Sequence, residues 1–573
     1  MSPSQIIVLA TPVFFLLIAV EFAWGYARGR DTYRLDDAIN SISLGMLSQI
    51  SAVLTRLLRV GIYTAVYASV ALFPVDAFWT TWYGWLIALV FYDLCYYWLH
   101  RAGHECAVFW AAHVVHHQSQ AYNLSTALRQ TSSGALLGWI FYLPMALAGV
   151  PPPVFGAVAL IDLLYQYWVH TEHVGKLGWF DRWFCSPSNH RVHHAVNERY
   201  LNRNYGGILI LWDRLFGSFQ EENGPCVYGT RSALNSWDPL WANAEVYWAL
   251  LHDCWHARNW LDKLRVWLKP PGWRPPDVAA RFPRPAFELA AVQRYAPPVS
   301  RAVQWFGAVQ FVLLLGAVAV FLWFADRQPL AINALWLGLL TTGLWATGAA
   351  LQGRLGVREV LLLECAALAT GTAALGLTPL HQVFKPLTML LAMYLVATDA
   401  RPPGAQGGVK PLLLAALGAS LVGDVWLMLP GNHFIAGLAS FLLAHLFYLL
   451  LLQRTSGTGR WFPSRIALAA TLVYGVAMVV VLWPGLRGPV LTGAVAFYAL
   501  VIALMAAQAL GRASVLRNRG AALVAAGACF FLLSDTLLAV NRFVQPLPMA
   551  ALWILASYYS AQILLARNML AKP

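Results

Sequence analysis

The chain has 573 residues, of which 59% are hydrophobic and only 11% are charged. So little charge cannot cover the surface of a soluble protein. Apolar runs of about 20 residues recur along the chain, and each is long enough to cross the hydrocarbon of a bilayer. The net charge of +13 comes without a basic motif or interleaved aromatic patch, so we expect no nucleic-acid partner and interpret the charge as a membrane-topology signal. Seven cysteines without a CxxC pair indicate neither a disulfide framework nor a cysteine zinc site.

The first part of the chain predicts membrane helices followed by a polar segment. Apolar runs at 6–24, 39–73, 82–99 and 136–169 predict helices, whereas 175–301 holds no spanning run and is rich in Trp, Pro and Arg. Basic residues follow the first run and none precedes it, which predicts a retained first span that ends in the cytoplasm. We expect the segment 175–301 to lie at the cytoplasmic membrane surface.

The second part is a ladder of ten apolar segments. They lie at 303–325, 331–351, 357–376, 380–397, 411–429, 433–453, 465–484, 489–510, 520–540 and 547–567. Basic loops alternate with loops that hold one basic residue or none, so the positive-inside bias predicts ten spans that begin and end in the cytoplasm. Arg outnumbers Lys 33 to 6, which suggests a GC-rich genome and a bacterial inner membrane.

Ten of the fifteen histidines gather between residues 100 and 194. They form four groups: His100 and His104; His113, His116 and His117; His170 and His173; His190, His193 and His194. Helix residues three or four apart share a face, so each group presents its imidazoles in one direction. Any single histidine could be an ordinary surface residue, as we expect for His252 and His256, but four such groups indicate metal binding. Clustered imidazoles without thiolates suit Fe, Zn, Cu or Ni and are too many for one ion, which predicts two ions on the cytoplasmic side.

Two carboxylates precede histidines on the same predicted helix faces. Asp93 is followed by Tyr97, His100 and His104 at helical spacing, and Asp162 by Gln166, His170 and His173. A carboxylate inside a membrane helix is costly and usually functional. We predict that Asp93 and Asp162 accept the second ring N–H of ligating histidines and fix their orientation.

The HxxxH and HxxHH patterns resemble the fatty acid hydroxylase and sterol desaturase family of membrane di-iron oxygenases. Within it, "YNLSTALRQ" at 122–130 and the segment 186–219 are similar to the alkylglycerol monooxygenase branch. The resemblance implies two histidine-bound irons and O₂, hydroxylation of the carbon next to an ether oxygen, and release of fatty aldehyde from an ether glycerolipid. It also implies an external reductant, for which tetrahydrobiopterin is the candidate. A sterol, fatty acid or carotenoid substrate is the alternative within the family.

Ionisable residues also interrupt the apolar ladder. Lys385, Asp424 and Asp535 come to a similar predicted depth, and His445 lies within a neighbouring helix. Two carboxylates in one pocket could serve as general acid and base, so we predict catalytic roles for these four residues, above all for Asp424 and Asp535. The alternative is a structural ion pair between Lys385 and one carboxylate.

The segments that carry these residues resemble a second family. "KPLTMLLAM", "GDVWLMLPGNHFIAGLASFLLAHLFY", "LLSDTLLAVNRF" and "SYYSAQILLA" are similar to the YhhN or lysoplasmalogenase family of eight-span membrane proteins. The resemblance implies hydrolysis of the vinyl ether of lysoplasmalogens to a fatty aldehyde.

The two resemblances predict an all-α membrane protein in three parts. These are a di-iron domain at 1–300, a connecting helix pair at 301–355 and an eight-helix domain at 356–573. The predicted function is a bifunctional enzyme that degrades ether lipids. A hydroxylase joined to a non-catalytic scaffold is the alternative; a transporter is disfavoured because the histidines cluster at helix ends and line no path across the bilayer.

Overall fold

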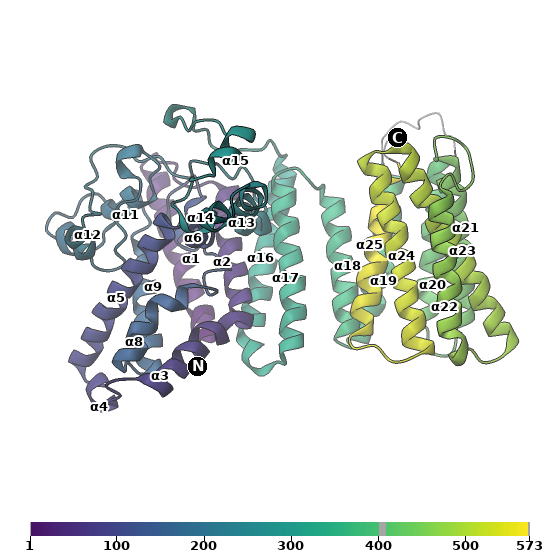
Figure 1. The fold of residues 1–573 in the computed structure, drawn as a ribbon, viewed down its shortest axis with the longest axis horizontal. Coiled ribbons are helices and arrows are strands. Elements are labelled where there is room, and N and C mark those ends of the chain that lie inside the picture. The colour runs from purple at the N-terminus through teal and green to yellow at the C-terminus, as the bar shows by residue number, and fades with distance from the viewer. Residues whose placement is uncertain (1, 400–407, 571–573) are drawn as a thin grey trace. The chain divides into compact units, whose positions relative to one another are not determined.

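The computed structural model describes residues 2–399 and 408–570 (Figure 1). The chain divides into two compact units, Met1–Leu355 (unit 1) and Gly356–Pro573 (unit 2). Within the described residues the regular structure is helical, and extended pairing is limited to the isolated bridges Phe184–Leu209 and Ala195–Tyr228. The predicted all-α fold is confirmed.

Unit 1 combines long apolar helices with short helices that carry polar residues. Its helices are α1 (Pro3–Ala27), α2 (Leu35–Arg56), α3 (Ile62–Val70), α4 (Asp76–Trp79), α5 (Trp82–Glu105), α6 (Ala107–His117), α7 (Leu124–Ala127), α8 (Leu143–Ala148), α9 (Pro152–Trp168), α10 (Phe180–Trp183), α11 (Pro187–His194), α12 (Leu211–Leu215), α13 (Pro239–His256), α14 (Trp260–Leu268), α15 (Pro276–Arg281), α16 (Arg301–Phe324) and α17 (Leu330–Leu351). The segment expected at the membrane surface accordingly forms only short helices and α13.

The break between α5 and α6 brings the histidine segments together. Cys106 has extended dihedral angles (φ −131°, ψ 126°), so the helical path ends there and restarts as α6 in a new direction. α5 packs against both α6 and α9. Tyr92 of α5 stacks on Tyr142, with ring centroids 4.7 Å apart, and lies against Phe155 of α9. This aromatic packing fixes the helices that lead into the histidines.

The helix pair α16 and α17 belongs to unit 1. Ile50 of α2 is fully buried in a core that includes Phe311 and Leu322 of α16 and Leu344 of α17. The pair predicted to connect two domains therefore packs on α2 as part of the first unit, because its apolar faces bury there.

Unit 2 forms eight helices within its described residues. They are α18 (Val357–Ala374), α19 (Thr378–Ala397), α20 (Val409–Met428), α21 (Phe434–Arg454), α22 (Arg465–Leu482), α23 (Pro489–Leu516), α24 (Arg519–Phe543) and α25 (Ala550–Asn568). Small residues allow close packing: a Cβ at Gly527 of α24 would lie 3.1 Å from the Cβ of Leu564 in α25.

Ten helices of the described residues are long and apolar enough to cross a membrane. They are α1, α2, α16, α17 and α19 to α24. All ten helices predicted for the ladder form, but α18 and α25 are not among these candidates. Glu359 of α18 and Arg567 of α25 form an ion pair at 2.9 Å, so each of these two helices has a charged residue that contacts the other helix. Length and composition support a multi-pass membrane protein.

Candidate histidine centre and a second polar site

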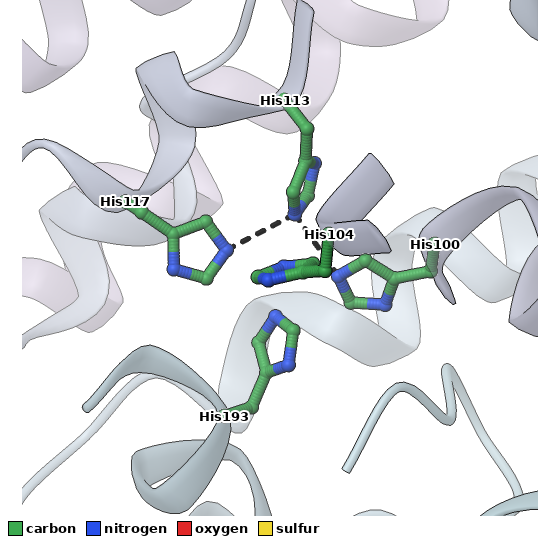
Figure 2. A group of neighbouring side chains, drawn as sticks. All are labelled: His100, His104, His113, His117 and His193. Carbon is green, nitrogen blue, oxygen red and sulfur yellow. Dashed lines mark hydrogen bonds between the residues drawn. The ribbon is translucent and has the colours of Figure 1, made fainter. Parts of the chain in front are cut away.

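Nine of the ten predicted histidines converge in two groups in unit 1. The five-histidine group is His100, His104, His113, His117 and His193, and the four-histidine group is His116, His170, His190 and His194. Within each group one ring nitrogen per residue lies within 4.8 Å of all the others. Figure 2 shows the five rings pointing toward one another from different parts of the chain. The His117 and His194 rings stack with centroids 4.3 Å apart, so the two groups are neighbours.

Backbone carbonyls hold the outer nitrogen of four of these rings. The Nδ1 atoms of His100, His116, His170 and His193 lie 2.7, 2.9, 2.8 and 3.1 Å from the carbonyl oxygens of Tyr205, Arg129, Gln166 and Arg203. A carbonyl oxygen only accepts, so Nδ1 must carry the hydrogen in each case. The Nε2 lone pair then faces the centre of each group, which is the tautomer a metal ligand needs.

The inner nitrogens are arranged as metal ligands. His116 Nε2 lies 3.1 Å from His170 Nε2, although both rings carry their hydrogen on Nδ1. Two lone pairs that face each other at this distance repel unless a cation lies beside them. In addition, the Nε2 atoms of His104 and His193 are buried and have no hydrogen-bond partner among the described residues. The donor set therefore fits metal ions, which imidazole binds at about 2.0–2.1 Å in the case of zinc.

Burial keeps the imidazoles neutral. It lowers the pKa of His116 to about 4, and it lowers the pKa of His190, His193 and His194 well below the usual value, with neighbouring histidines adding to the effect. A neutral ring has a free lone pair at neutral pH. The site is thus poised to accept cations without first losing protons.

The predicted hydrogen bonds from ring nitrogens to Asp93 and Asp162 are wrong. Asp93 instead accepts from the backbone N–H of Ile208 and Leu209, at 2.7 and 3.0 Å, and from Trp212 Nε1. Asp162 accepts from Gln166 Nε2 at 2.6 Å, and its Oδ1 is buried without a partner among the described residues. The backbone carbonyl of Gln166 in turn accepts from His170 Nδ1. Each carboxylate therefore binds groups next to the histidine segments and does not contact the rings themselves.

Asp213, which the sequence reasoning missed, holds the same loop from the other side. It accepts from the backbone N–H of Tyr205 and Gly206 and from Ser218 Oγ, at 2.7 to 2.8 Å. Burial raises its pKa to about 6, while these donors favour the charged form. Asp93 and Asp213 together fix the backbone whose Tyr205 carbonyl holds His100. No spacing pattern links Asp213 to a histidine, so only the folded loop shows this role.

The fourth histidine segment, Pro187–His194, is fastened by Arg191. Its helix α11 begins at Pro187 after a Ser186 cap, in which the Ser186 hydroxyl accepts from Asn189 N–H. Arg191 forms a two-pronged ion pair with Glu222, with both N–O distances 2.8 Å. The same guanidinium donates to the carbonyls of Thr171 and Val174, which bracket the loop after His170.

Two further polar residues outside the histidine pattern support the site. The buried guanidinium of Arg129 donates to Val115 O, Asn40 Oδ1 and Gln118 Oε1, and its own carbonyl holds His116. Glu21 of α1 accepts from Tyr33, from Leu124 N–H and from Thr171 Oγ1. A lone Glu in the first apolar run was a usable signal, since such a residue in a membrane helix is costly.

His173 does not join either histidine group. Its Nε2 lies 3.2 Å from Thr32 Oγ1, and a Cβ at Gly25 would lie 3.0 Å from the same nitrogen. The prediction of His173 as a metal ligand is therefore wrong. Helix α9 ends at Trp168, so the helical spacing that paired His173 with His170 does not continue to these residues.

Unit 2 holds two separate polar groups. Lys385 Nζ pairs with Asp424 Oδ1 at 3.2 Å, and the Tyr558 hydroxyl donates to Asp424 Oδ2 at 2.6 Å. In the second group Tyr498 donates to Asp535 Oδ2 at 2.5 Å, and His445 Nε2 lies 2.8 Å from the Tyr498 hydroxyl and 3.3 Å from Asp535 Oδ2. The Phe531 ring lies against both His445 and Tyr558, with centroids 4.6 and 5.5 Å apart. The sequence predicts one shared pocket, whereas each carboxylate has its own partners.

A hollow lies beside Asp535. It is formed by α20 to α24 and encloses, with its open mouth, about 740 Å³. Its lining includes Leu438, Phe441, Met478, Ile502, Ala539 and Phe543. Asp535 and the hydroxyl-bearing Tyr498, Tyr474 and Thr536 supply its polar atoms, and neither Asp424 nor Lys385 lines it. Asp424 is thus in an ion pair, whereas Asp535 faces apolar space.

The fold and these sites define an α-helical membrane protein with a buried histidine centre. Comparison with known proteins is in agreement: residues 85–218 match the fatty acid hydroxylase family and residues 380–569 match the YhhN family. The chain is 36% identical over 310 residues to alkylglycerol monooxygenase of Homo sapiens, an alignment that covers 53% of this chain and 68% of the relative.

The second part has its own relative. It is 36% identical over 183 residues to lysoplasmalogenase TMEM86B of Sus scrofa, which covers 32% of this chain and 72% of the relative. A further relative, ornithine lipid hydroxylase OlsE of Rhizobium tropici, is 28% identical over 141 residues, 24% of this chain and 43% of its own. No solved structure matches the chain. The chain belongs to the fatty acid hydroxylase family through its first part and to the YhhN family through its second, which supports an enzyme with an oxygenase-like and a hydrolase-like part.

His193 lies in the five-histidine group and His173 lies in neither group, so we expect their replacement to affect metal binding differently. We expect His193→Ala to weaken metal binding at least about 10-fold, because even the loss of a residue that only supports a ligand typically costs 10–100-fold. His173→Ala, the matched control, should bind metal as the parent does. Elemental analysis after dialysis against a graded chelator measures both. Equal losses in the two variants would contradict the grouping.

The Lys385–Asp424 pair predicts a stability effect that a double variant can reverse. Asp424→Asn leaves Lys385 buried without its partner, which we expect to cost about 3–5 kcal/mol. The double variant Lys385→Met/Asp424→Asn removes both charges and should recover most of the loss. Thermal unfolding of the purified protein in detergent measures the difference. A double variant as unstable as the single one would show that the pair is not the source of the effect.

Proposed function

We propose that unit 1 is a di-iron oxygenase that hydroxylates the carbon next to the ether oxygen of alkylglycerols. The observation that carries this proposal is the pair of facing lone pairs on His116 and His170 within two groups of buried, neutral imidazoles. Nine ligands in two adjacent groups suit two ions. The relatives named alkylglycerol monooxygenase support the substrate class.

The chain's own residues hold and shield the centre. The nine imidazoles would hold the irons, which supply the redox chemistry that a C–H bond requires and that acid–base groups cannot perform. The Tyr205, Arg129, Gln166 and Arg203 carbonyls keep four rings in their ligand tautomer. His190, His193 and His194 are buried, so bulk water has little access to their rings.

The overall reaction consumes O₂ and two electrons. One oxygen atom enters the C–H bond next to the ether oxygen, and the other leaves as water with two protons. The hydroxylated product is a hemiacetal, whose C–O bond breaks to give a fatty aldehyde and glycerol. The electrons come from an external donor, and tetrahydrobiopterin is the candidate that we propose.

Purified, iron-loaded protein should release aldehyde from an alkylglycerol only when O₂ and a reductant are present. His193→Ala should abolish this release, whereas His173→Ala should retain it. Aldehyde is measured by derivatisation and mass spectrometry. Aldehyde released at the same rate without O₂ would refute the oxygenase, and turnover of a sterol, fatty acid or carotenoid instead of the ether would favour the alternative substrate.

A second function is favoured by the carboxyl that faces the hollow in unit 2. We propose that unit 2 hydrolyses the vinyl ether of lysoplasmalogens, with the ionisable groups around Asp424 and Asp535 moving the protons. The relatives named lysoplasmalogenase support this activity. The whole chain would then degrade saturated and vinyl ethers of glycerolipids by two routes, each releasing a fatty aldehyde in the membrane.

The second activity should need neither oxygen nor metal. We expect the purified protein to release aldehyde from a lysoplasmalogen under argon and after chelation, because protonation of a vinyl ether requires only an acid and water. Asp535→Asn should lower this rate at least about 100-fold, the usual contribution of a general acid, and leave the alkylglycerol reaction unchanged. If the purified protein hydrolyses no lysoplasmalogen under argon, the result would instead favour a hydroxylase joined to a non-catalytic scaffold.

A further inference from the structure

We propose that the hollow beside Asp535 binds the hydrocarbon chain of the vinyl-ether lipid and places its double bond at Asp535. The inference rests on the hydrolysis proposed for unit 2. It adds where the hydrocarbon chain of the substrate lies and which carboxyl group meets the double bond.

The lining fits an alkyl chain and little else. Leu438, Phe441, Met478, Ile502 and Phe543 surround the space with apolar side chains. Two of the hydroxyls at its edge satisfy each other, since Tyr474 and Thr536 are hydrogen-bonded at 2.8 Å. A polar headgroup would find few partners here, whereas each methylene that leaves water or lipid fills space between side chains.

The hollow extends along one face of α24. Asp535, Ala539 and Phe543 are spaced four residues apart, so they lie above one another on that face, and all three line the hollow. At about 1.5 Å per residue this row is roughly 12 Å long. A chain that begins at Asp535 therefore passes the Cβ of Ala539, where a small side chain leaves room.

The hydrogen bonds of Asp535 involve one of its two oxygens. Tyr498 and His445 both contact Oδ2. The side chain is 17% exposed, against 2% for Asp424. Asp535 also lines the hollow, and these hydrogen bonds do not use its other oxygen, Oδ1. Asp424, by contrast, has one oxygen on Lys385 and the other on the Tyr558 hydroxyl, and it does not line the hollow.

The reaction then balances around one carboxyl. Asp535 gives its proton to the alkene carbon remote from the ether oxygen, and the double-bond electron pair forms the new C–H bond. An oxygen lone pair forms the second bond of the oxocarbenium ion. Water adds to the carbon bonded to the ether oxygen and returns a proton to Asp535, and the resulting hemiacetal breaks into an aldehyde and a glycerol hydroxyl. No oxidant or metal takes part.

Ala539→Phe tests the chain site, because its ring would fill the hollow one turn beyond Asp535. We expect kcat/KM for a 1-hexadecenyl lysoplasmalogen to fall about tenfold or more, since the ring takes the space in which the chain packs against the apolar lining. A 1-propenyl substrate, whose chain ends before Ala539 at about 6 Å from Asp535, should be affected far less. Ala522→Phe, at an exposed position of the same helix, is the matched control and should leave both substrates unchanged. Ala539→Leu, a smaller intrusion, serves if the Phe variant melts at a lower temperature.

A binding measurement separates this inference from the proposed hydrolysis. Under argon and without a reductant, a saturated 1-hexadecyl lysolipid with a spin label near its chain end reacts at neither site, and the difference in its immobilisation between the parent and Ala539→Phe reports chain binding in the hollow. Immobilisation that Ala539→Phe abolishes supports the chain site even if no lysoplasmalogen is hydrolysed. Hydrolysis whose chain-length preference is the same in the parent, Ala539→Phe and Ala539→Leu would overturn the inference and leave the hydrolase standing.

Discussion

The histidine centre depends on carbonyl oxygens that accept one hydrogen from each of four rings. A carbonyl cannot donate, so each of these contacts fixes both the tautomer and the direction of the inner lone pair. Two rings fixed in this way, His116 and His170, face each other through unprotonated nitrogens. The backbone thereby holds two lone pairs toward each other, an arrangement that a bound cation stabilises.

The loops that supply these carbonyls need anchors of their own. The Tyr205 loop is held from two sides, by Asp93 in α5 and by Asp213. Arg191 similarly ties the loop after His170 to Glu222. Buried carboxylates and guanidiniums are costly unless each donor and acceptor finds a partner, and here the partners are the backbone groups of the loops. The charged residues around the centre therefore position backbone, and the backbone positions the rings.

The sequence predicted the helices and nine of the ten clustered histidines because spacing on a helix determines which side chains share a face. That reasoning fails where the helix ends. His173 follows the end of α9 by five residues, so it contacts Thr32 and lies outside both groups. Spacing also cannot show what a face meets. Asp93 lies on the histidine side of α5, yet its acceptor atoms meet the backbone of a loop more than a hundred residues away. In unit 2, similar predicted depth placed Asp424 and Asp535 together; the two carboxyl groups have different hydrogen-bond partners, and the Phe531 ring contacts one partner of each.

The different sizes of the two polar sites follow from the bonds that the proposed reactions break. A saturated ether offers only a C–H bond, which no side-chain acid or base can cleave, so that reaction needs redox ions and enough imidazoles to hold them. A vinyl ether already carries a carbon that accepts a proton, and one correctly placed carboxyl with water is sufficient. Nine histidines supported by charged anchors on the one hand, and a single carboxyl at the edge of an apolar hollow on the other, are what these two reactions require. The hydrocarbon chain, which is common to both proposed substrates, needs only apolar helices to pack against, and both units contain such helices.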